Sequence, residues 1–423
     1  MNVNFLIFIS LVIFMIITML IMDNQDIKNQ VKKITKSIFK DIVKIRRWIH
    51  KHPELSFKEK KTSEYICKIL EQNNIQFQSG FAGYGVVALI KCNNSNSQVI
   101  GLRADMDALP IQEKNNIDYK SIYDGVMHAC GHDVHTAILL GTAIVLNRLK
   151  HNLKGTIKFI FQPAEEKLPG GASLMIKEGI LLNPKIDKML ALHVFPEFEV
   201  GKVGFRSGKY MAACDELYIS LIGKGGHAAL PDSVINPIIM GAELILNVKS
   251  AVKKLPSDEQ YILEFGDFRA YGASNVIPDE ANIKGTLRTL NEDFREKAHS
   301  IILNEAKKIQ KKYNATCSFD IKKGYPVLCN DKDLTDFCKR LSKFFLSSDS
   351  VKNLDIRMAS EDFSYFSQNV PSCFFRIGVA NSKKNINHSV HTPYFNIDDK
   401  SLEIGVGLMS YLTISNLLNQ KKV

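Results

Sequence analysis

Hydrophobic and polar residues alternate along the chain in two patterns, one typical of buried strands and one typical of helices. Four short apolar runs predict strands, at 97–107, 155–166, 187–195 and 372–379, and the first two end in acidic residues. Longer segments with apolar residues three or four positions apart predict helices, at 29–49, 133–149 and 400–418. Strands that alternate with helices are typical of an α/β protein with a mixed, mostly parallel sheet.

The pattern changes between residues 211 and 325. The predicted elements there are strand, helix, strand, strand, helix and strand, at 215–223, 234–252, 259–270, 280–290, 292–312 and 315–322. This order is the ferredoxin-like α+β arrangement. Because the earlier pattern then resumes, we predict that 211–325 is a lid domain inserted into a larger domain formed by 29–210 and 326–423. A chain of 423 residues is long enough for two hydrophobic cores.

The N-terminus has a different character from the rest of the chain. The first 22 residues carry no charged side chain, and Phe5 to Met22 is almost continuously apolar. Such a run is about the minimum length for a membrane-spanning helix. Several lysines follow it, which favours a cytoplasmic position for the remainder of the chain. We predict that residues 1–24 form a membrane anchor, and a signal peptide or a start codon placed too far upstream are the alternatives.

Composition excludes some classes of protein. The net charge of +11 comes from lysines spread over the whole chain, and no nucleic-acid-binding motif accompanies them, so no nucleic-acid partner is expected. The eight cysteines form no C-x-x-C pair and show no regular spacing. That distribution argues against a disulfide framework and favours a reducing compartment.

The segment "HACGHDVH" (128–135) is the strongest chemical signal in the chain. It holds three histidines, a cysteine and an aspartate in eight positions. In an extended or turning segment, Cys130 and His132 project to the same side, as two ligands of one ion must. Nitrogen and sulfur donors of this kind are typical of zinc and related metals. The segment therefore predicts a metal site.

Further ligand-type residues follow other predicted strands. Glu165 and Glu166 come directly after one apolar strand, and His193 ends another. The carboxyl ends of parallel strands meet at one edge of a sheet, where open α/β sheets place their sites. One of the two glutamates can bind a metal while the other faces the bound water. Near the C-terminus "NHSVHTPYF" offers His388 and His391, and the residue types alone do not choose between them.

Eight motifs, in order, resemble those of the M20 peptidase family, in particular its amidohydrolase branch of N-acyl-amino-acid deacylases, hippurate hydrolases and auxin-conjugate hydrolases. The resemblance covers residues 30–418, and the apolar N-terminus lies outside it. The motifs are "GLRADMDALP", "MHACGHDVHTA", "FQPAEE", "ALHVFP", "GKGGHAALP", "NVIPDEANIKGTLRTL", "SEDFSYF" and "HTPYF".

The resemblance implies a two-metal site holding Mn²⁺ or Zn²⁺ in the larger, catalytic domain. It implies the ligand set Cys130, His132, Glu166, His193 and His391. His391 is favoured over His388 because the last ligand histidine of the family stands two residues before a proline, here Pro393. Glu165 matches the general base, while Asp105 and Asp107 match an acidic pair behind the ligands.

The resemblance also assigns residues to the lid. It implies that His227 stabilises the oxyanion of the reaction and that Asn275 and Arg288 bind the polar end of the substrate. A homodimer formed through the lid domain is a further expectation.

The expected reaction is removal of the acyl group from an N-acylated amino acid, of the hippurate or N-acetyldiaminopimelate type for example. A dipeptidase or aminopeptidase with the same two-metal site is the alternative within this chemistry. Two other classes remain open, a thiol hydrolase that uses Cys130 as its nucleophile and a binding protein without catalysis. Chelation separates the first of them from a metal enzyme.

Overall fold

The structure is a computed structural model that describes residues 3–95, 97–256 and 260–419, with side chains from residue 24 onward. The chain forms two compact units. Unit 1 consists of Met1–Ser207, Asn330–Leu354 and Asn369–Val423, and unit 2 consists of Gly208–Cys329 and Asp355–Gln368. Residues 355–368, which fall within the range predicted for the larger domain, are thus part of unit 2.

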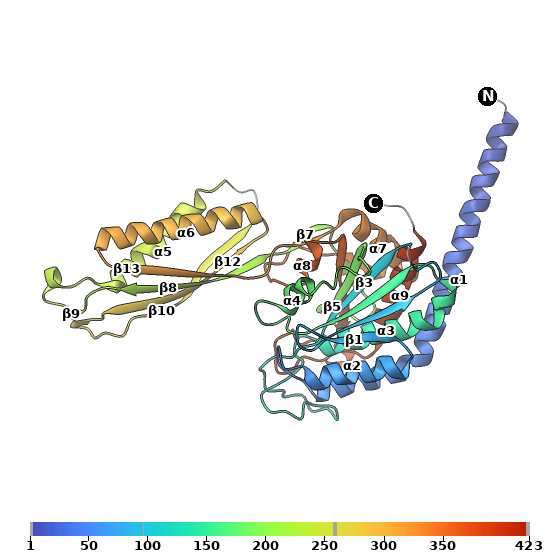
Figure 1. Cartoon of the computed structure of the whole chain (residues 1–423), viewed down its shortest axis with the longest axis horizontal. Helices are drawn as coiled ribbons and strands as arrows, with labels where there is room; N and C mark the ends of the chain where they lie inside the picture. Colours follow the sequence, from blue (N-terminus) through green and yellow to red (C-terminus); the bar gives the residue numbers. More distant parts are fainter. Residues whose placement is uncertain (1–2, 96, 257–259, 420–423) are drawn as a thin grey trace. The chain divides into compact units, whose positions relative to one another are not determined.

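An eight-stranded sheet forms the centre of unit 1 (Figure 1). Four neighbouring strands in its middle, in the order β4, β3, β5 and β16, run parallel to one another. On one side β2 pairs antiparallel with β4 and with β1, and on the other side β6 pairs antiparallel with β16 and parallel with β15. This arrangement confirms the predicted mixed, mostly parallel sheet. In sheet order the strands are β1 (Gln76–Phe81), β2 (Gly85–Lys91), β4 (Thr156–Gln162), β3 (Val99–Asp105), β5 (Lys188–Glu199), β16 (Ser372–Ala380), β6 (Val203–Phe205) and β15 (Val351–Asn353).

Side-chain alternation along β4 explains how the sheet is covered on both faces. Ile157, Phe159 and Phe161 are buried in the large hydrophobic core that the sheet shares with the helices. Lys158 points to the other face, where its Nζ donates hydrogen bonds to the carbonyl oxygens of Ile180, Leu182 and Pro184 at 2.8, 2.8 and 2.9 Å. Burial lowers the pKa of Lys158 to about 8.

Helices that pack on one another cover the core face of the sheet. The central one, α3, is buried over almost its whole length, as expected for a helix that is apolar on all sides. The helices of unit 1 are α1 (Val3–Lys51), α2 (Lys60–Gln72), α3 (His132–Leu149), α4 (Gly171–Lys177), α7 (Lys332–Phe345) and α9 (Lys400–Leu418).

Two helices, α1 and α9, are relevant to the prediction of a membrane anchor. Among the described residues, α9 is long and apolar enough to cross a membrane, but 83% of its apolar stretch is buried inside the protein, as in a core helix. The predicted anchor, residues 1–24, coincides with the start of α1, and its side chains up to residue 23 lie outside the described part of the chain.

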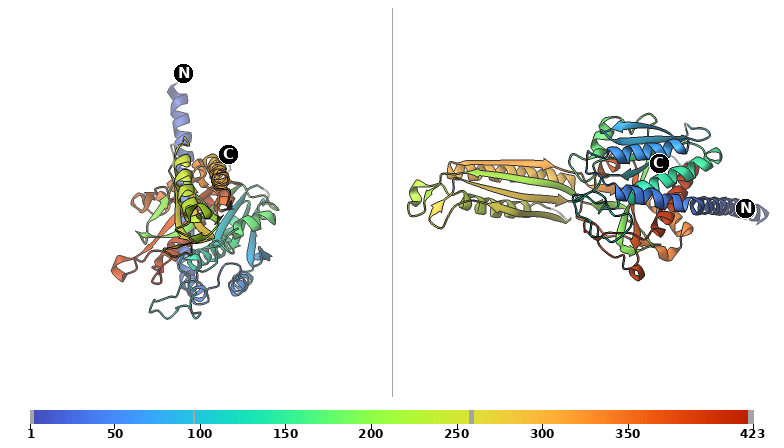
Figure 2. Two further views of the ribbon diagram at one scale, coloured as in Figure 1. Left: turned by 90° about the vertical axis from the view of Figure 1, so that its left-hand side faces the viewer. Right: turned by 90° about the horizontal axis from the view of Figure 1, so that it is seen from below.

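Unit 2 has the ferredoxin-like arrangement predicted for the inserted domain. The four strands of its main sheet are all antiparallel and lie in the order β10-β12-β8-β13, and α5 and α6 pack side by side on one face (Figures 1 and 2). It has a hydrophobic core of its own. In chain order its helices and strands are β7 (Gly208–Met211), β8 (Ala213–Ile222), β9 (Gly226–His227), α5 (Pro237–Lys253), β10 (Tyr261–Arg269), β11 (Val276–Ile277), β12 (Glu280–Thr289), α6 (Glu292–Tyr313), β13 (Thr316–Lys323) and α8 (Ser364–Ser367), while β14 (Leu328–Asn330) lies at the boundary with unit 1.

A buried carboxylate ties together the two ends of the inserted segment. Asp215, near the start of β8, accepts hydrogen bonds from the amide of Gly324, just after β13, at 2.9 Å and from the Nε of Arg295 at 2.9 Å. His299 contacts the same carboxylate at 2.6 Å. Burial by itself raises the pKa of Asp215, but the hydrogen bonds from Arg295 and His299 dominate and hold it at about 2.

Candidate metal centre

A glycine turn at the start of α3 positions the first two predicted ligands. Gly131 precedes the helix with a φ of 84°, a left-handed conformation that glycine adopts without strain. A Cβ at this position would lie 2.7 Å from a side-chain carbon of Val194, so the close approach to β5 also requires glycine. The turn places Cys130 beside His193 and Val194 in the middle of β5.

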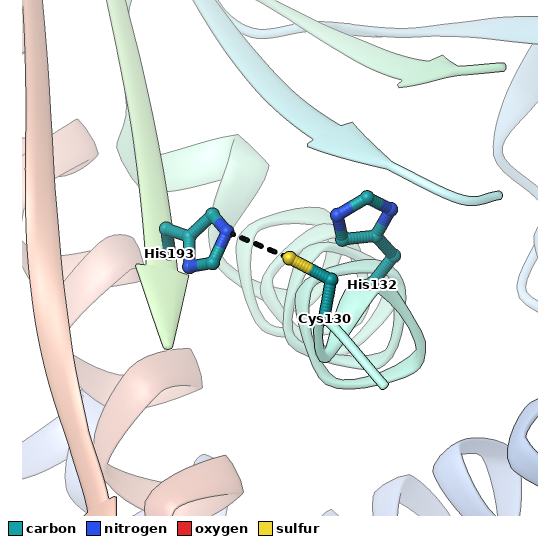
Figure 3. A group of neighbouring side chains, drawn as sticks. All are labelled: Cys130, His132 and His193. Carbon is teal, nitrogen blue, oxygen red and sulfur yellow. Dashed lines mark hydrogen bonds between the residues drawn. The ribbon is translucent and has the colours of Figure 1, made fainter. Parts of the chain in front are cut away.

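The hydrogen bonds of His132 and His193 leave the same ring nitrogen of each facing the site. The Nδ1 of His132 lies 3.1 Å from Asp107 Oδ1, and the Nδ1 of His193 lies 2.8 Å from the carbonyl oxygen of Val194. Each Nδ1 is therefore a donor, and each Nε2 carries the lone pair. The Nε2 of His193 lies 3.4 Å from Cys130 Sγ, with His132 beside Cys130 in Figure 3. In metal-binding histidines, the ring nitrogen that does not bind the ion typically donates a hydrogen bond that orients the ring.

His391 reaches the same place from the C-terminal part of the chain. Its amide donates to the carbonyl oxygen of Ala129 at 2.8 Å, which fixes the loop next to Cys130. Its Nε2 lies 3.3 Å from Cys130 Sγ and 3.2 Å from Glu166 Oε1. Hydrogen bonds to Cys130 and Glu166 raise the pKa of His391 to about 10. The side chain is 51% exposed, so His391 forms the open side of the cluster.

The five predicted ligands thus form one cluster with the chemistry of a metal site. Potential ligand atoms of Cys130, His132 and His193 lie within 4.8 Å of one another, and the same holds for Cys130, Glu166 and His391. Within the described residues, the buried Nε2 of His132 has no hydrogen-bond partner. An unpartnered buried acceptor is costly unless something binds it, and a metal ion satisfies an imidazole lone pair. Sulfur, nitrogen and carboxylate donors together suit a divalent transition metal.

The other histidines near the site have different surroundings. Both ring nitrogens of His135 are occupied, because Nδ1 lies 2.6 Å from Asp105 Oδ1 and Nε2 accepts from the amide of Val194 at 2.9 Å. His128 is buried, and within the described chain neither of its ring nitrogens has a hydrogen-bond partner. His388 is exposed and packs its ring against Tyr394, with the ring centroids 5.3 Å apart. The structure therefore brings His391, and not His388, to the cluster.

Two buried aspartates stand behind the ligands. Asp105 accepts from Arg103 Nη1 at 2.7 Å, and Asp107 accepts from Ser56 Oγ at 2.6 Å in addition to its contact with His132. Burial raises the pKa of both carboxyl groups, but their cationic and hydrogen-bonding neighbours outweigh it and lower the pKa of each. Both aspartates are therefore ionised at neutral pH. Ser56 and Arg103 were not among the predicted site residues, and nothing in the sequence pairs Ser56 with a residue 51 positions away.

Asp107 also holds the turn that carries the two glutamates. Its Oδ1 accepts from the amide of Glu165 at 3.1 Å, and its Oδ2 accepts from the amide of Glu166 at 3.0 Å. Potential ligand atoms of Glu165 and Glu166 lie within 4.8 Å of one another and of His132. The predicted base and the predicted ligand are thus adjacent at the site, and the base is almost fully buried.

The predicted lid residues are not gathered at one place in unit 2. His227 lies on β9 (Gly226–His227), which pairs with β11 (Val276–Ile277), and the carbonyl oxygen of Asn275 accepts from the amide of Ala228 at 3.0 Å. His227 and Asn275 are therefore neighbours, beyond the Glu280 end of β12. Arg288 lies eight residues along that strand from Glu280, roughly 25 Å away at the usual rise of a strand.

Comparison with known proteins identifies the family. Residues 101–414 match the family described as "Peptidase family M20/M25/M40". The chain belongs to this family. The resemblance predicted from the motifs is therefore confirmed.

Three similar proteins indicate which kinds of M20 member resemble this chain. An N-acyl-L-amino acid amidohydrolase from Geobacillus stearothermophilus is 38% identical over 72% of this chain and 82% of the relative. Thermostable carboxypeptidase 2 from Saccharolobus solfataricus is 34% identical over 92% of this chain and 98% of the relative. The crystal structure of the YXEP protein of Bacillus subtilis, described as a dinuclear metal-binding peptidase of the M20 family, matches with a TM-score of 0.78 at 30% identity, over 91% of this chain and 99% of that one.

The first prediction separates the two C-terminal histidines. His391→Ala removes a ring that lies beside Cys130 and Glu166, so the purified variant should hold less than about half the metal of the wild type after dialysis, since loss of a ligand weakens binding. His388→Ala is the matched control and should keep the full metal content, measured by plasma emission spectrometry. Equal loss in both variants, or loss in His388→Ala alone, would contradict the assignment.

Proposed function

We propose that this protein is a metal-dependent amidohydrolase that removes the acyl group from N-acylated amino acids. The observation that carries the proposal is a buried carboxylate, Glu165, next to a cluster of five metal-ligand side chains. A site built only to hold metal needs no second glutamate that stays outside the ligand set. The similarity to an N-acyl-L-amino acid amidohydrolase supports the same class of substrate.

The ligands in this proposal are Cys130, His132, Glu166, His193 and His391, and they hold two divalent ions. When bound, such ions polarise a carbonyl oxygen and lower the pKa of a water molecule. A cysteine thiolate among the ligands favours Zn²⁺, while the carboxylate and imidazole donors also accept Mn²⁺.

The remaining chemistry belongs to the side chains of the protein. Glu165 takes the proton of the attacking water as general base and then delivers it to the leaving amine as general acid. Asp107 keeps Glu165 in place through the amides of the turn and keeps His132 in the correct tautomer. His227 donates a hydrogen bond to the oxyanion that develops on the scissile carbonyl, and Asn275 and Arg288 bind the polar end of the substrate.

Two alternatives have specific support. The first is a dipeptidase or aminopeptidase with the same two-metal site, and the similarity to a carboxypeptidase supports cleavage of a peptide bond but not that specificity. The contacts of Cys130 Sγ with His193 at 3.4 Å and with His391 at 3.3 Å also resemble a cysteine–histidine nucleophile pair. Burial, however, raises the pKa of the Cys130 thiol, which disfavours a free thiolate nucleophile. Activity that survives complete removal of divalent metal would favour the thiol mechanism.

The second prediction distinguishes the base from the ligand. Glu165→Gln should keep its metal and lose a factor of about 10² to 10⁴ in kcat on N-acetyl and N-benzoyl amino acids, because only the proton-transfer group is removed. Glu166→Gln, which differs from it by one position, should lose metal as well as activity. Metal loss in Glu165→Gln with full retention in Glu166→Gln would reverse the two roles.

The geometry of unit 2 supports a homodimer in this proposal. His227, on β9, lies beyond the Glu280 end of the four-stranded sheet, and Arg288 lies near the opposite end of β12, a separation that a single small N-acyl amino acid does not bridge. If both contact the same substrate, they come from two chains. Unit 2 also exposes an edge strand, β13, and three large apolar side chains on α5, which are Ile238, Ile239 and Leu246 at 39%, 53% and 68% exposure. We infer that two chains associate through unit 2.

The third prediction tests whether His227 acts on the partner subunit. His227→Ala and Glu165→Gln should each be nearly inactive alone. A mixed dimer of the two variants would have one site with an intact Glu165 facing an intact His227 of the partner subunit. Random pairing should therefore restore about one quarter of wild-type kcat after the variants are co-expressed. A mixture no more active than its components would contradict action between subunits.

The fourth prediction concerns the N-terminus, for which we propose a membrane anchor with the catalytic part in the cytoplasm. The support is the charge-free apolar run that ends at Met22 and the lysines that follow it. Deletion of residues 1–24 should give an enzyme in the soluble fraction with unchanged kcat/KM. The full-length chain should sediment with membranes and resist carbonate extraction. Full-length protein recovered from the soluble fraction would contradict the anchor.

A further inference from the structure

Three successive amides in the turn after β4 are bound by two buried carboxylates. Asp107 accepts from the amides of Glu165 and Glu166, as described above. The amide of Ala164, immediately before them, donates to Glu59 Oε1 at 2.8 Å. Glu59 comes from the segment that precedes α2, 105 residues away in the sequence. It is fully buried.

The turn contains a residue in an unfavourable backbone conformation, which contacts with other segments must stabilise. Ala164 has a φ of 52°, in the left-handed region that a residue with a Cβ rarely adopts. The amide of Gly171 donates to the carbonyl oxygen of Ala164 at 2.9 Å, which closes the loop that follows. A Cβ at position 171 would lie 1.8 Å from the carbonyl oxygen of Pro163, so this closure also depends on glycine. Glu59 is thus bound to the one residue of the turn that is held in an unfavourable conformation.

The surroundings of Glu59 show that its side chain is not used to cap its own helix. Glu59 stands at the N-cap position of α2, yet its side chain makes no capping hydrogen bond there. Glu54 performs that task instead, accepting from the amides of Lys61 at 3.2 Å and Thr62 at 2.9 Å. A carboxylate at a helix N-cap normally accepts from the first turn of the helix. The carboxylate of Glu59 is instead directed at Ala164.

Burial of the Glu59 carboxyl group is unfavourable in free energy, and its contact with the turn must offset that loss. Burial and the negative charge of Asp107 raise the pKa of Glu59 to about 7. Within the described residues its Oε2 is buried without a hydrogen-bond partner. A buried carboxyl that only stabilised the fold would gain more from pairing both oxygens. The backbone amides of Glu59 and Phe57 also interact with this carboxyl group, but the hydrogen bond from Ala164 is the one that reaches the turn carrying the base and a ligand.

From this geometry we infer that Glu59 is a positioning residue, which holds the Ala164 turn so that Glu165 points at the attacking water. The inference rests on the proposed role of Glu165 as the base. Glu59 reaches the turn through the backbone amide of Ala164, so in this inference it acts on Glu165 through the backbone. Its loss lets the φ of Ala164 relax, which moves the carboxylate of Glu165. A misplacement of about 1 Å at a reacting group is enough to cost about 100-fold in rate.

Three variants of the full-length chain test the inference. Glu59→Ala removes the acceptor and should lower kcat by about 10- to 100-fold, with KM and metal content close to wild type. Glu59→Gln keeps an oxygen at the same place and should stay within about threefold of the wild-type kcat. Glu54→Ala is the matched control, because it removes the cap of the same helix without touching the turn. It should leave kcat unchanged even if it lowers Tm.

Hydrogen exchange of the amides of residues 164–166, read by mass spectrometry, gives a measurement that does not depend on catalysis. Exchange should be faster in Glu59→Ala and unchanged in Glu54→Ala and Glu59→Gln. If Glu59→Ala does not fold, Glu59→Asp replaces it, since its shorter side chain withdraws the carboxylate from Ala164 and should give the same slower turnover and faster exchange.

The outcomes separate this inference from the proposed function. Full kcat in Glu59→Ala, or slow turnover in Glu59→Gln equal to that of Glu59→Ala, overturns the positioning role. So does unchanged exchange at residues 164–166 in Glu59→Ala. Full activity in Glu165→Gln overturns the proposed base, and with it the catalytic part of the inference, whereas the exchange measurement still decides whether Glu59 holds the turn.

Discussion

The arrangement of the site depends on the hydrogen bonds of one buried carboxylate, that of Asp107. It contacts a ring nitrogen of His132 and accepts from the amides of Glu165 and Glu166. These contacts link a predicted ligand on α3 to the turn at the end of β4, so the spacing between ligand and base is set by a single group. Four hydrogen-bond donors, Ser56 among them, offset the cost of burying its charge. The parallel pairing of β3 with β4 brings the ends of the two strands together and makes this possible.

The sequence carried enough information to predict the fold class and the cluster of ligand-type side chains. Each of these predictions rests on a local signal: an apolar strand followed by polar residues, as before Glu165 or at His193, or several donors within a few positions, as at Cys130 and His132. Because parallel strands end at one edge, such local signals converge in space without knowledge of the contacts. The choice of His391 over His388 needed the spacing to Pro393 that the family resemblance supplied, since both histidines lie in one loop.

The parts that sequence could not predict depend on contacts between distant segments. The hydrogen bond from Ala164 to Glu59 is an example, because Glu59 lies in a polar stretch that looks like an ordinary exposed helix start. The opposite placement of His227 and Arg288 is another, since it follows from the register of β12 against β8, which no local pattern reveals. Strand β1 was missed because its residues are mostly exposed and lack an apolar alternation.

The bonds of Asp215 have a consequence for how such a chain folds. They join the strand that enters unit 2 to the segment that leaves it, so the two ends of a long insertion lie next to each other. Once the segment 208–329 has folded, its two ends are held near each other, so the entropy of closing this long loop has already been lost before the two halves of unit 1 associate. Since unit 2 has its own core, it can form first and act as a template for joining the two halves of unit 1. The topology therefore makes the inserted unit an aid to folding of the domain it interrupts.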